Sequence, residues 1–221
     1  MKEYKTIIEN CNILYSIGNQ ILPLIKIPES IRPNFQGLSI SKELFKVGER
    51  GRAIAWIKNW LQSNAKGYVT ICDPYFDETQ VWIMQYIPVD LQVRIVCSGK
   101  KFGFTPSKDD STNVKKNNKK MAKEEILGSW GKISNQSPPP TFVVIHGSVY
   151  EGDRDQFHDR YIITDGAGIS IGTSLNGLGN QESFITVLNP DDVKYVEATY
   201  ISPKLSIDQF FSQIIYFELE E

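Results

Sequence analysis

The first half of the chain contains two amphipathic segments, each followed by a short apolar run. Over residues 49–65 apolar side chains recur at three- and four-residue spacing, which is typical of an amphipathic helix. The run that follows, residues 68–72, is nearly continuously apolar and rich in β-branched side chains, as in a strand covered on both faces. A second amphipathic helix over residues 78–86 and a second buried strand over residues 92–97 complete a strand-helix-strand unit with a parallel pair.

The second half of the chain alternates between polar stretches and further apolar runs. Four of these runs are expected as strands, over residues 141–145, 157–164, 169–172 and 183–188. The middle pair is joined through Asp165-Gly166, a strong hairpin signal. Residues 98–120 lack periodicity and predict a mobile loop that runs into a helix over residues 122–130, while residues 207–217 have the spacing of a closing helix.

These elements predict an α/β fold with a mixed, mostly parallel sheet and helices on both faces. Residues 1–45 combine short apolar runs with Pro and Gly, so we expect an N-terminal extension there and one main domain over residues 46–221. No repeat of fixed period is visible in the chain.

Composition narrows the class of protein. The 221 residues include 41% apolar and 23% charged side chains, as in ordinary globular proteins. A net charge of −2 gives no global positive field, so any polyanion site must be a local patch. Three cysteines without metal-ligand spacing, and no apolar stretch near the length of a membrane span, lead us to expect a cytoplasmic protein with no metal site.

Histidine chemistry is restricted to two side chains, His146 and His158. His158 begins an expected strand, and because side chains alternate along a strand, His158 and Arg160 project from the same face. An imidazole beside a guanidinium suits a phosphate, since the guanidinium forks onto phosphoryl oxygens and a neutral imidazole can attack phosphorus or carry a proton. We expect His146 to be structural.

The hairpin returns to the His158 strand with small and hydroxylated residues. Thr173, Ser174 and Asn176 could donate hydrogen bonds to a phosphate, and Glu182 or Asp165 could hold the imidazole tautomer. Asp165 could equally serve as a turn residue. Asp73, which follows the first buried strand, is expected to be a strand-end residue.

One lysine-rich stretch could contact a polyanion. Lys115, Lys116, Lys119 and Lys120 lie close together in the expected loop. Such a run is most often a solvated face, and the alternative is contact with the phosphate backbone of a nucleic acid.

At His158, Arg160, Asp165 and Gly172 the sequence resembles the phospholipase D superfamily. The family motif is His-x-Lys, four residues, Asp, six residues, then Gly-Ser/Gly-x-Asn. Arg160 stands in place of the family lysine, and Asn176 lies one position beyond the family asparagine. The segment Asp73-Pro74-Tyr75-Phe76 also looks like the early part of such domains.

The resemblance implies a phospholipase D-like fold and a metal-independent phosphodiesterase without cofactors. His158 would attack phosphorus, a second histidine would protonate the leaving oxygen, and Arg160 would neutralise the phosphoryl oxygens. With one motif per chain, the second histidine would come from a homodimer partner. A nucleic acid, DNA or RNA, is the favoured substrate over a phospholipid.

A second hypothesis is a non-catalytic module that binds a phosphate of a nucleic acid or phospholipid in the same pocket. The replaced lysine and the shifted asparagine motivate it. The resemblance also suggests a domain of a larger defence protein.

Overall fold

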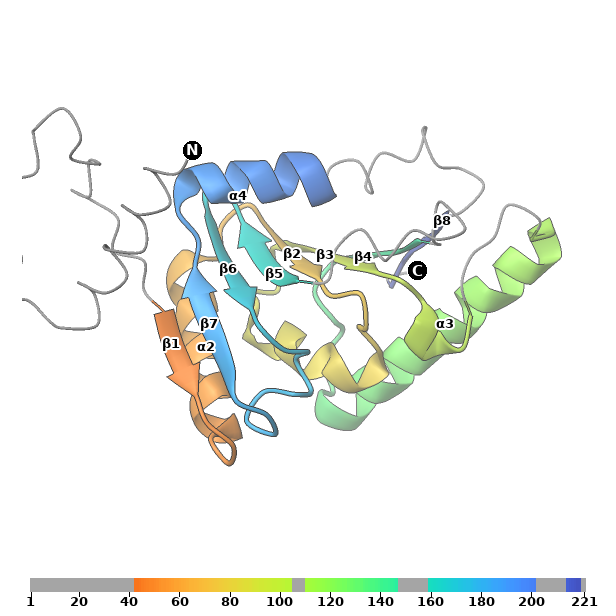
Figure 1. The fold of residues 1–221 in the computed structure, drawn as a ribbon. Coiled ribbons are helices and arrows are strands. Elements are labelled where there is room, and N and C mark those ends of the chain that lie inside the picture. Colours follow the sequence, from red (N-terminus) through yellow and green to blue (C-terminus); the bar gives the residue numbers. More distant parts are fainter. Residues whose placement is uncertain (1–41, 105–109, 147–158, 202–213, 220–221) are drawn as a thin grey trace, which may run out of the picture. The chain divides into compact units, whose positions relative to one another are not determined.

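The computed structural model describes residues 42–104, 110–146, 159–201 and 214–219, and all structural statements below concern these residues. They form an eight-stranded sheet with the strand order β1-β7-β6-β5-β2-β3-β4-β8 (Figure 1). The strands are β1 (Lys42–Phe45), β2 (Tyr68–Cys72), β3 (Gln92–Cys97), β4 (Thr141–His146), β5 (Arg160–Thr164), β6 (Ala167–Ile171), β7 (Ser183–Val187) and β8 (Ile214–Glu218). The helices are α2 (Arg50–Asn64), η3 (Glu78–Tyr86), η4 (Lys100–Phe102), α3 (Thr112–Ile133), α4 (Pro190–Val196) and η5 (Glu197–Ile201).

The sheet is mixed, which confirms the expected α/β class. The expectation of mostly parallel pairing was wrong. The pairs β2–β3 and β3–β4 are parallel, whereas the five pairs that involve β1, β5, β6, β7 or β8 are antiparallel. A short turn at Asp165-Gly166 forces β5 and β6 to run in opposite directions, because a parallel connection needs a long crossover.

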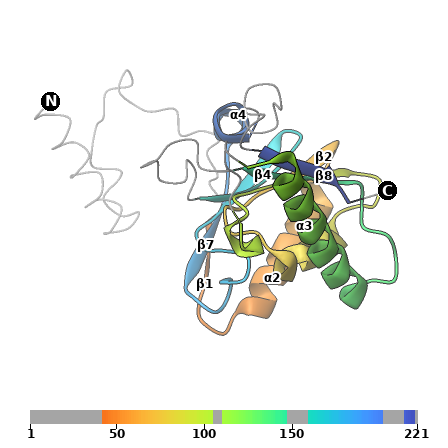
Figure 2. The ribbon, with the colours of Figure 1, turned by 90° about the vertical axis from the view of Figure 1, so that its right-hand side faces the viewer.

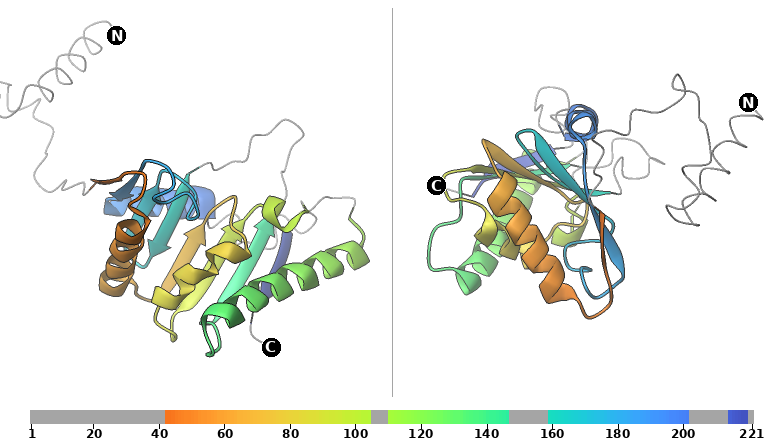
Figure 3. Two further views of the ribbon diagram at one scale, coloured as in Figure 1. Left: turned by 90° about the horizontal axis from the view of Figure 1, so that it is seen from below. Right: turned by 90° about the vertical axis from the view of Figure 1, so that its left-hand side faces the viewer.

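Helices cover both faces of the sheet, as predicted. The main apolar core lies between one face and the helices α2, η3 and α3, and it includes Val69 and Ile71 of β2. The next residue of the strand, Cys72, points to the other face and packs in a smaller cluster with Val193 and Val196 of α4. Figures 2 and 3 show α4 on the opposite side of the sheet from α2 and α3.

Three expected elements differ from the structure. The helix expected to begin near residue 122 begins at Thr112, so the lysine run is helical, because Ser111 caps the first turn and neither Gly nor Pro interrupts the next fifteen residues. Residues 214–217 have the spacing of the predicted closing helix but lie in β8, where pairing with β4 overrides that spacing. The segment Glu78–Tyr86 forms a 3₁₀-helix rather than an α-helix.

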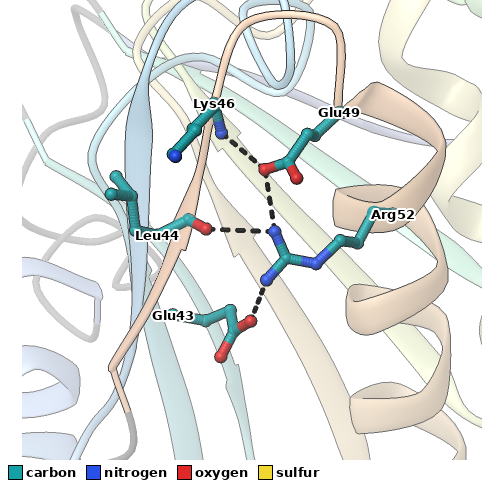
Figure 4. Close-up of polar contacts among 5 residues, drawn as sticks. All are labelled: Glu43, Leu44, Lys46, Glu49 and Arg52. Atoms are coloured by element: carbon teal, nitrogen blue, oxygen red, sulfur yellow. Dashed lines mark hydrogen bonds and ion pairs between the residues drawn. The ribbon is translucent and has the colours of Figure 1, made fainter.

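The edge strand β1 falls within residues 1–45, the range expected as the extension. β1 pairs with β7, and Arg52 of α2 ties it to the helix (Figure 4). The guanidinium of Arg52 contacts the carboxylates of Glu43 and Glu49 and donates to the backbone carbonyl of Leu44 at 3.2 Å. None of the helices in the described part of the chain is long and apolar enough to cross a membrane.

Candidate functional site

The strand pairing brings several polar residues to one edge of the sheet. Cys72 at the end of β2 pairs with Tyr161 near the start of β5, so Asp73 and Arg160 become neighbours. Arg160 also pairs with Ile171, the last residue of β6. The segment that leaves β6 at Gly172 therefore starts at the same edge. This edge is also where the parallel strands β2, β3 and β4 end, a common position for ligand sites in α/β sheets.

Arg160 and Asp73 form an ion pair at this edge. The Arg160 Nε lies 3.7 Å from the Asp73 Oδ1, and the side chains are 18% and 1% exposed. The guanidinium carbon also lies 5.4 Å from the centre of the Tyr75 ring. Within the described residues, neither the Arg160 Nε nor the Asp73 Oδ2 has a hydrogen-bond partner. Buried polar atoms of this kind are normally satisfied, so the site has unused hydrogen-bonding capacity for a ligand or water.

Asp73 also joins β2 to the segment after β6. Its Oδ1 accepts a hydrogen bond from the Tyr75 backbone N–H at 2.9 Å, and its carboxylate interacts with the backbone N–H of Leu175. Burial raises the pKa of Asp73 above its ordinary value of 3.8, while Tyr75, Arg160 and Leu175 act in the opposite direction. Asp73 thus contacts β2, β5 and the Leu175 segment at once.

A second charged side chain, Arg50, also holds that segment. Nη1 of Arg50, the first residue of α2, donates to the carbonyls of Leu175, Asn176 and Leu178 at 3.2, 3.1 and 3.1 Å. The close approach requires glycine at position 179, where φ is +71° and a Cβ would lie 2.1 Å from the Arg50 backbone nitrogen. We call residues 172–179, fixed between Arg50 and Asp73, the anchored loop.

The three residues predicted to bind phosphate all lie in the anchored loop, but they differ in how far their side-chain hydrogen-bonding groups are already engaged. Thr173 is buried and its hydroxyl lies 3.4 Å from the Gln181 Oε1. The Ser174 Oγ accepts the Gly177 N–H at 3.1 Å, which leaves its own O–H available as a donor. The Asn176 side-chain amide donates to the Thr79 hydroxyl of η3, so this amide is engaged within the protein.

The residues predicted to be catalytic are only partly brought together. His158 lies outside the described residues, two positions before Arg160 in the sequence. Glu182 is exposed and directly precedes β7, at the same edge as the anchored loop. Asp165 is exposed in the β5–β6 turn, at the opposite end of β5 from Arg160. Of the two carboxylates, Glu182 is thus the one near the candidate site.

The remaining candidates lie elsewhere. His146 ends β4, and the strands β2 and β3 separate it from β5. Lys115, Lys116, Lys119 and Lys120 lie in the first turns of α3, away from the core. In the described ranges there is no cluster of three or more histidine, cysteine or acidic residues that could hold a metal ion.

Sequence reasoning missed two residues that shape the site. The sequence pattern predicts only a strand-end role for Asp73. Its position directly after a buried parallel strand was the available signal, because ligand crevices form at such ends. Arg50 could not have been found, since its partners are backbone carbonyls far along the chain and carry no sequence signature.

Comparisons with known proteins give structural similarities at low identity. NucT from Helicobacter pylori superposes with a TM-score of 0.47 and 12% identity, over 75% of this chain and 96% of NucT. TrmBL2, an archaeal chromatin protein with a described mode of DNA binding, gives 0.37 and 10%, over 89% of this chain and 60% of TrmBL2. No family model and no curated protein matches the sequence. Similarity at this level assigns no function by itself.

Proposed function

We propose that the chain is a metal-independent phosphodiesterase, a nuclease in preference to a lipase, whose site lies at the edge where Arg160, Asp73 and the anchored loop meet. The observation that carries the proposal is the Arg160 guanidinium, which forms an ion pair with a buried carboxylate and lies two residues after His158 in the sequence. Within the described residues its Nε has no hydrogen-bond partner. A guanidinium is suited to phosphoryl oxygens, and an imidazole is suited to attack on phosphorus.

The proposed reaction proceeds in two displacements. A neutral His158 nitrogen donates its lone pair to phosphorus, the bond from phosphorus to the leaving oxygen breaks, and a second histidine gives that oxygen a proton. A water molecule then attacks the phosphohistidine and loses its proton to the second histidine, and the N–P bond breaks to return neutral His158. We assign the second histidine to His158 of a homodimer partner, and we assign to Glu182 the role of holding an imidazole tautomer.

Arg160 would stabilise the negative charge that builds on the phosphoryl oxygens in both steps. Asp73 would aim the guanidinium, because an arginine held by a buried carboxylate has lost most of its rotamer freedom before substrate arrives. Among the hydroxyls of the anchored loop, Ser174 retains a donor for the phosphate.

One observation favours a second function, a phosphate-binding module without turnover. The Asn176 amide is already engaged with Thr79 and the Arg160 charge is already opposed by Asp73, so the site offers fewer free donors than the motif suggested. A module of this kind would bind a phosphodiester through Arg160 and would release it unchanged. It could be one domain of a larger defence protein.

The two functions are separated by a cleavage assay in EDTA with bis(p-nitrophenyl) phosphate, DNA and RNA. The phosphodiesterase predicts release of p-nitrophenol or cleaved nucleic acid by the wild type, none by His158→Ala, and a dimer in sedimentation. Binding of nucleic acid without cleavage, abolished by Arg160→Ala and unaffected by His158→Ala, would instead support the binding module.

A further inference from the structure

We propose that the first half of α3, residues 112–123, is a binding surface for the phosphate backbone of a nucleic acid. We call it the basic half of α3. The inference deepens the proposed function, on which it rests for the reaction, by naming the surface that would select a nucleic acid over a small phosphodiester. Binding of a nucleic acid to this surface can be tested independently of cleavage.

The charge of this segment is one-sided. It contains five lysines, and no Asp or Glu occurs between Thr112 and Lys123. The lysines are Lys115, Lys116, Lys119, Lys120 and Lys123. Because the whole chain has a net charge of −2, this local density stands out against an overall weakly acidic protein. A local cationic patch is what binding to a polyanion requires.

The basic half of α3 contributes little to the core. The buried residues of α3 are Ala122, Ile126 and Trp130, so the packing begins where the lysine run ends. Figures 1 and 3 show the first turns of α3 extending past the β4–β8 side of the sheet. α3 follows β3 through η4 and leads into β4, so its basic half lies toward the edge where β3 ends, the edge of the candidate site.

The density of lysines also has an electrostatic cost for the helix. Like charges four residues apart on a helix repel. Lys115 with Lys119 and Lys116 with Lys120 are such pairs. Lys120 also forms an exposed ion pair with Glu124 at 3.7 Å, and exposed pairs of this kind contribute little to stability. A row of phosphates would remove the repulsion, so binding should stabilise the helix.

The spacing of the lysines suits a phosphate chain better than a membrane. Residues four apart on a helix are about 6 Å apart along its axis, so two parallel rows of ammonium groups can follow one strand. A membrane-surface helix also needs an apolar face. Here Ala122, Ile126 and Trp130 are turned to the core, and the large exposed apolar side chains of the basic half are Val114 and Met121.

The test measures oligonucleotide binding as a function of salt. Fluorescence anisotropy with a labelled single strand and a duplex compares the wild type with a variant in which Lys115, Lys116, Lys119 and Lys120 are changed to Gln. Lys132→Gln is the matched control, because Lys132 is exposed in the last turn of the same helix. Far-ultraviolet circular dichroism establishes that each variant is folded.

We expect the fourfold variant to bind at least about tenfold more weakly at low salt, with the slope of log Kd against log salt reduced by about 3, at roughly 0.7 to 0.9 per lost contact. Lys132→Gln should match the wild type in oligonucleotide affinity, in the salt slope and in bis(p-nitrophenyl) phosphate cleavage. Unchanged oligonucleotide affinity and slope in the fourfold variant would overturn the inference. It would also be overturned if the fourfold variant lost binding to anionic phospholipid vesicles but kept its binding to oligonucleotides. Lysine-dependent binding without cleavage by the wild type would overturn the proposed function and leave this inference standing.

Discussion

The carboxylate of Asp73 and the guanidinium of Arg160 meet across the β2–β5 pair, with 3.7 Å between the Oδ1 and the Nε. The carboxylate is 1% exposed, and one cation and backbone N–H groups offset part of the cost of burying this anion. The pair joins the end of β2 to the start of β5. Loss of this ion pair should therefore affect both the stability of this edge of the sheet and the proposed reaction.

The pH dependence of stability should report the burial of Asp73. Because its pKa is raised in the folded protein, the folded state holds the proton more tightly than the unfolded chain. The resulting stability is present below pH 3.8 and is lost as the pH rises through the raised pKa. The loss amounts to about 1.4 kcal/mol for every pH unit that separates the folded and unfolded pKa values. Urea titrations from pH 3.5 upward should show wild type losing stability relative to Asp73→Asn; a constant difference would contradict the assignment.

Arg160 should matter for both cleavage and stability. Arg160→Ala removes the charge proposed to stabilise the transition state and leaves Asp73 without its cation. We expect a loss of about 10²- to 10³-fold in phosphodiester cleavage and a destabilisation of about 3 kcal/mol. Arg160→Lys keeps the charge and should recover part of both quantities. Steady-state kinetics with urea unfolding test this, and equal activity of wild type and Arg160→Ala would refute the role.

The contact between Gly179 and Arg50 should make position 179 intolerant. Gly179→Ala places a Cβ against the Arg50 backbone in a left-handed conformation, so we expect more than about 2 kcal/mol of destabilisation. Gly128→Ala is the control, since nothing lies within 4 Å of the added Cβ and helix propensity favours Ala by about 1 kcal/mol. Thermal unfolding measures both, and a neutral Gly179→Ala would show that the anchored loop is looser than the structure has it.

The Cys97 thiol should be inert in the folded protein. It is completely buried, and burial raises its pKa to about 12, so the reactive thiolate is scarce at neutral pH. Cys72 is also buried, as its place in an apolar run predicted. Mass spectrometry after iodoacetamide at pH 8 should find both side chains unlabelled in native protein and labelled in urea. Rapid native labelling of either would contradict the packing.

The local pattern of apolar residues was sufficient to predict the strands and helices whose apolar side chains pack in the main core. The strands around Ile71 and Ile95 and the helix of Ile57 follow from apolar spacing, because burial and secondary structure reinforce each other there. The segment around Ile215 has helical spacing but pairs with β4, a partner far away in sequence. A single sequence does not reveal such a partner, and tertiary pairing decides the outcome.

The candidate site likewise contains some residues that local sequence predicts and others that only contacts between distant elements bring together. Arg160 and the hydroxyls after Gly172 could be predicted, because a hairpin fixes their register within a few residues. Asp73 and Arg50 reach the site through contacts between distant elements, and these depend on the order of strands in the sheet. Asp165 matched the motif by sequence position, yet its turn lies at the other end of β5.

The central claim is tested most directly by trapping the covalent intermediate. Wild type and His158→Ala are mixed with excess bis(p-nitrophenyl) phosphate in EDTA, quenched in alkali, where the N–P bond survives, and measured by intact-protein mass spectrometry. We predict a p-nitrophenyl phosphoryl adduct on wild type, with one equivalent of p-nitrophenol released per adduct formed, and no adduct on His158→Ala. Turnover by wild type with no adduct under these conditions, or the same adduct on His158→Ala, would contradict the account.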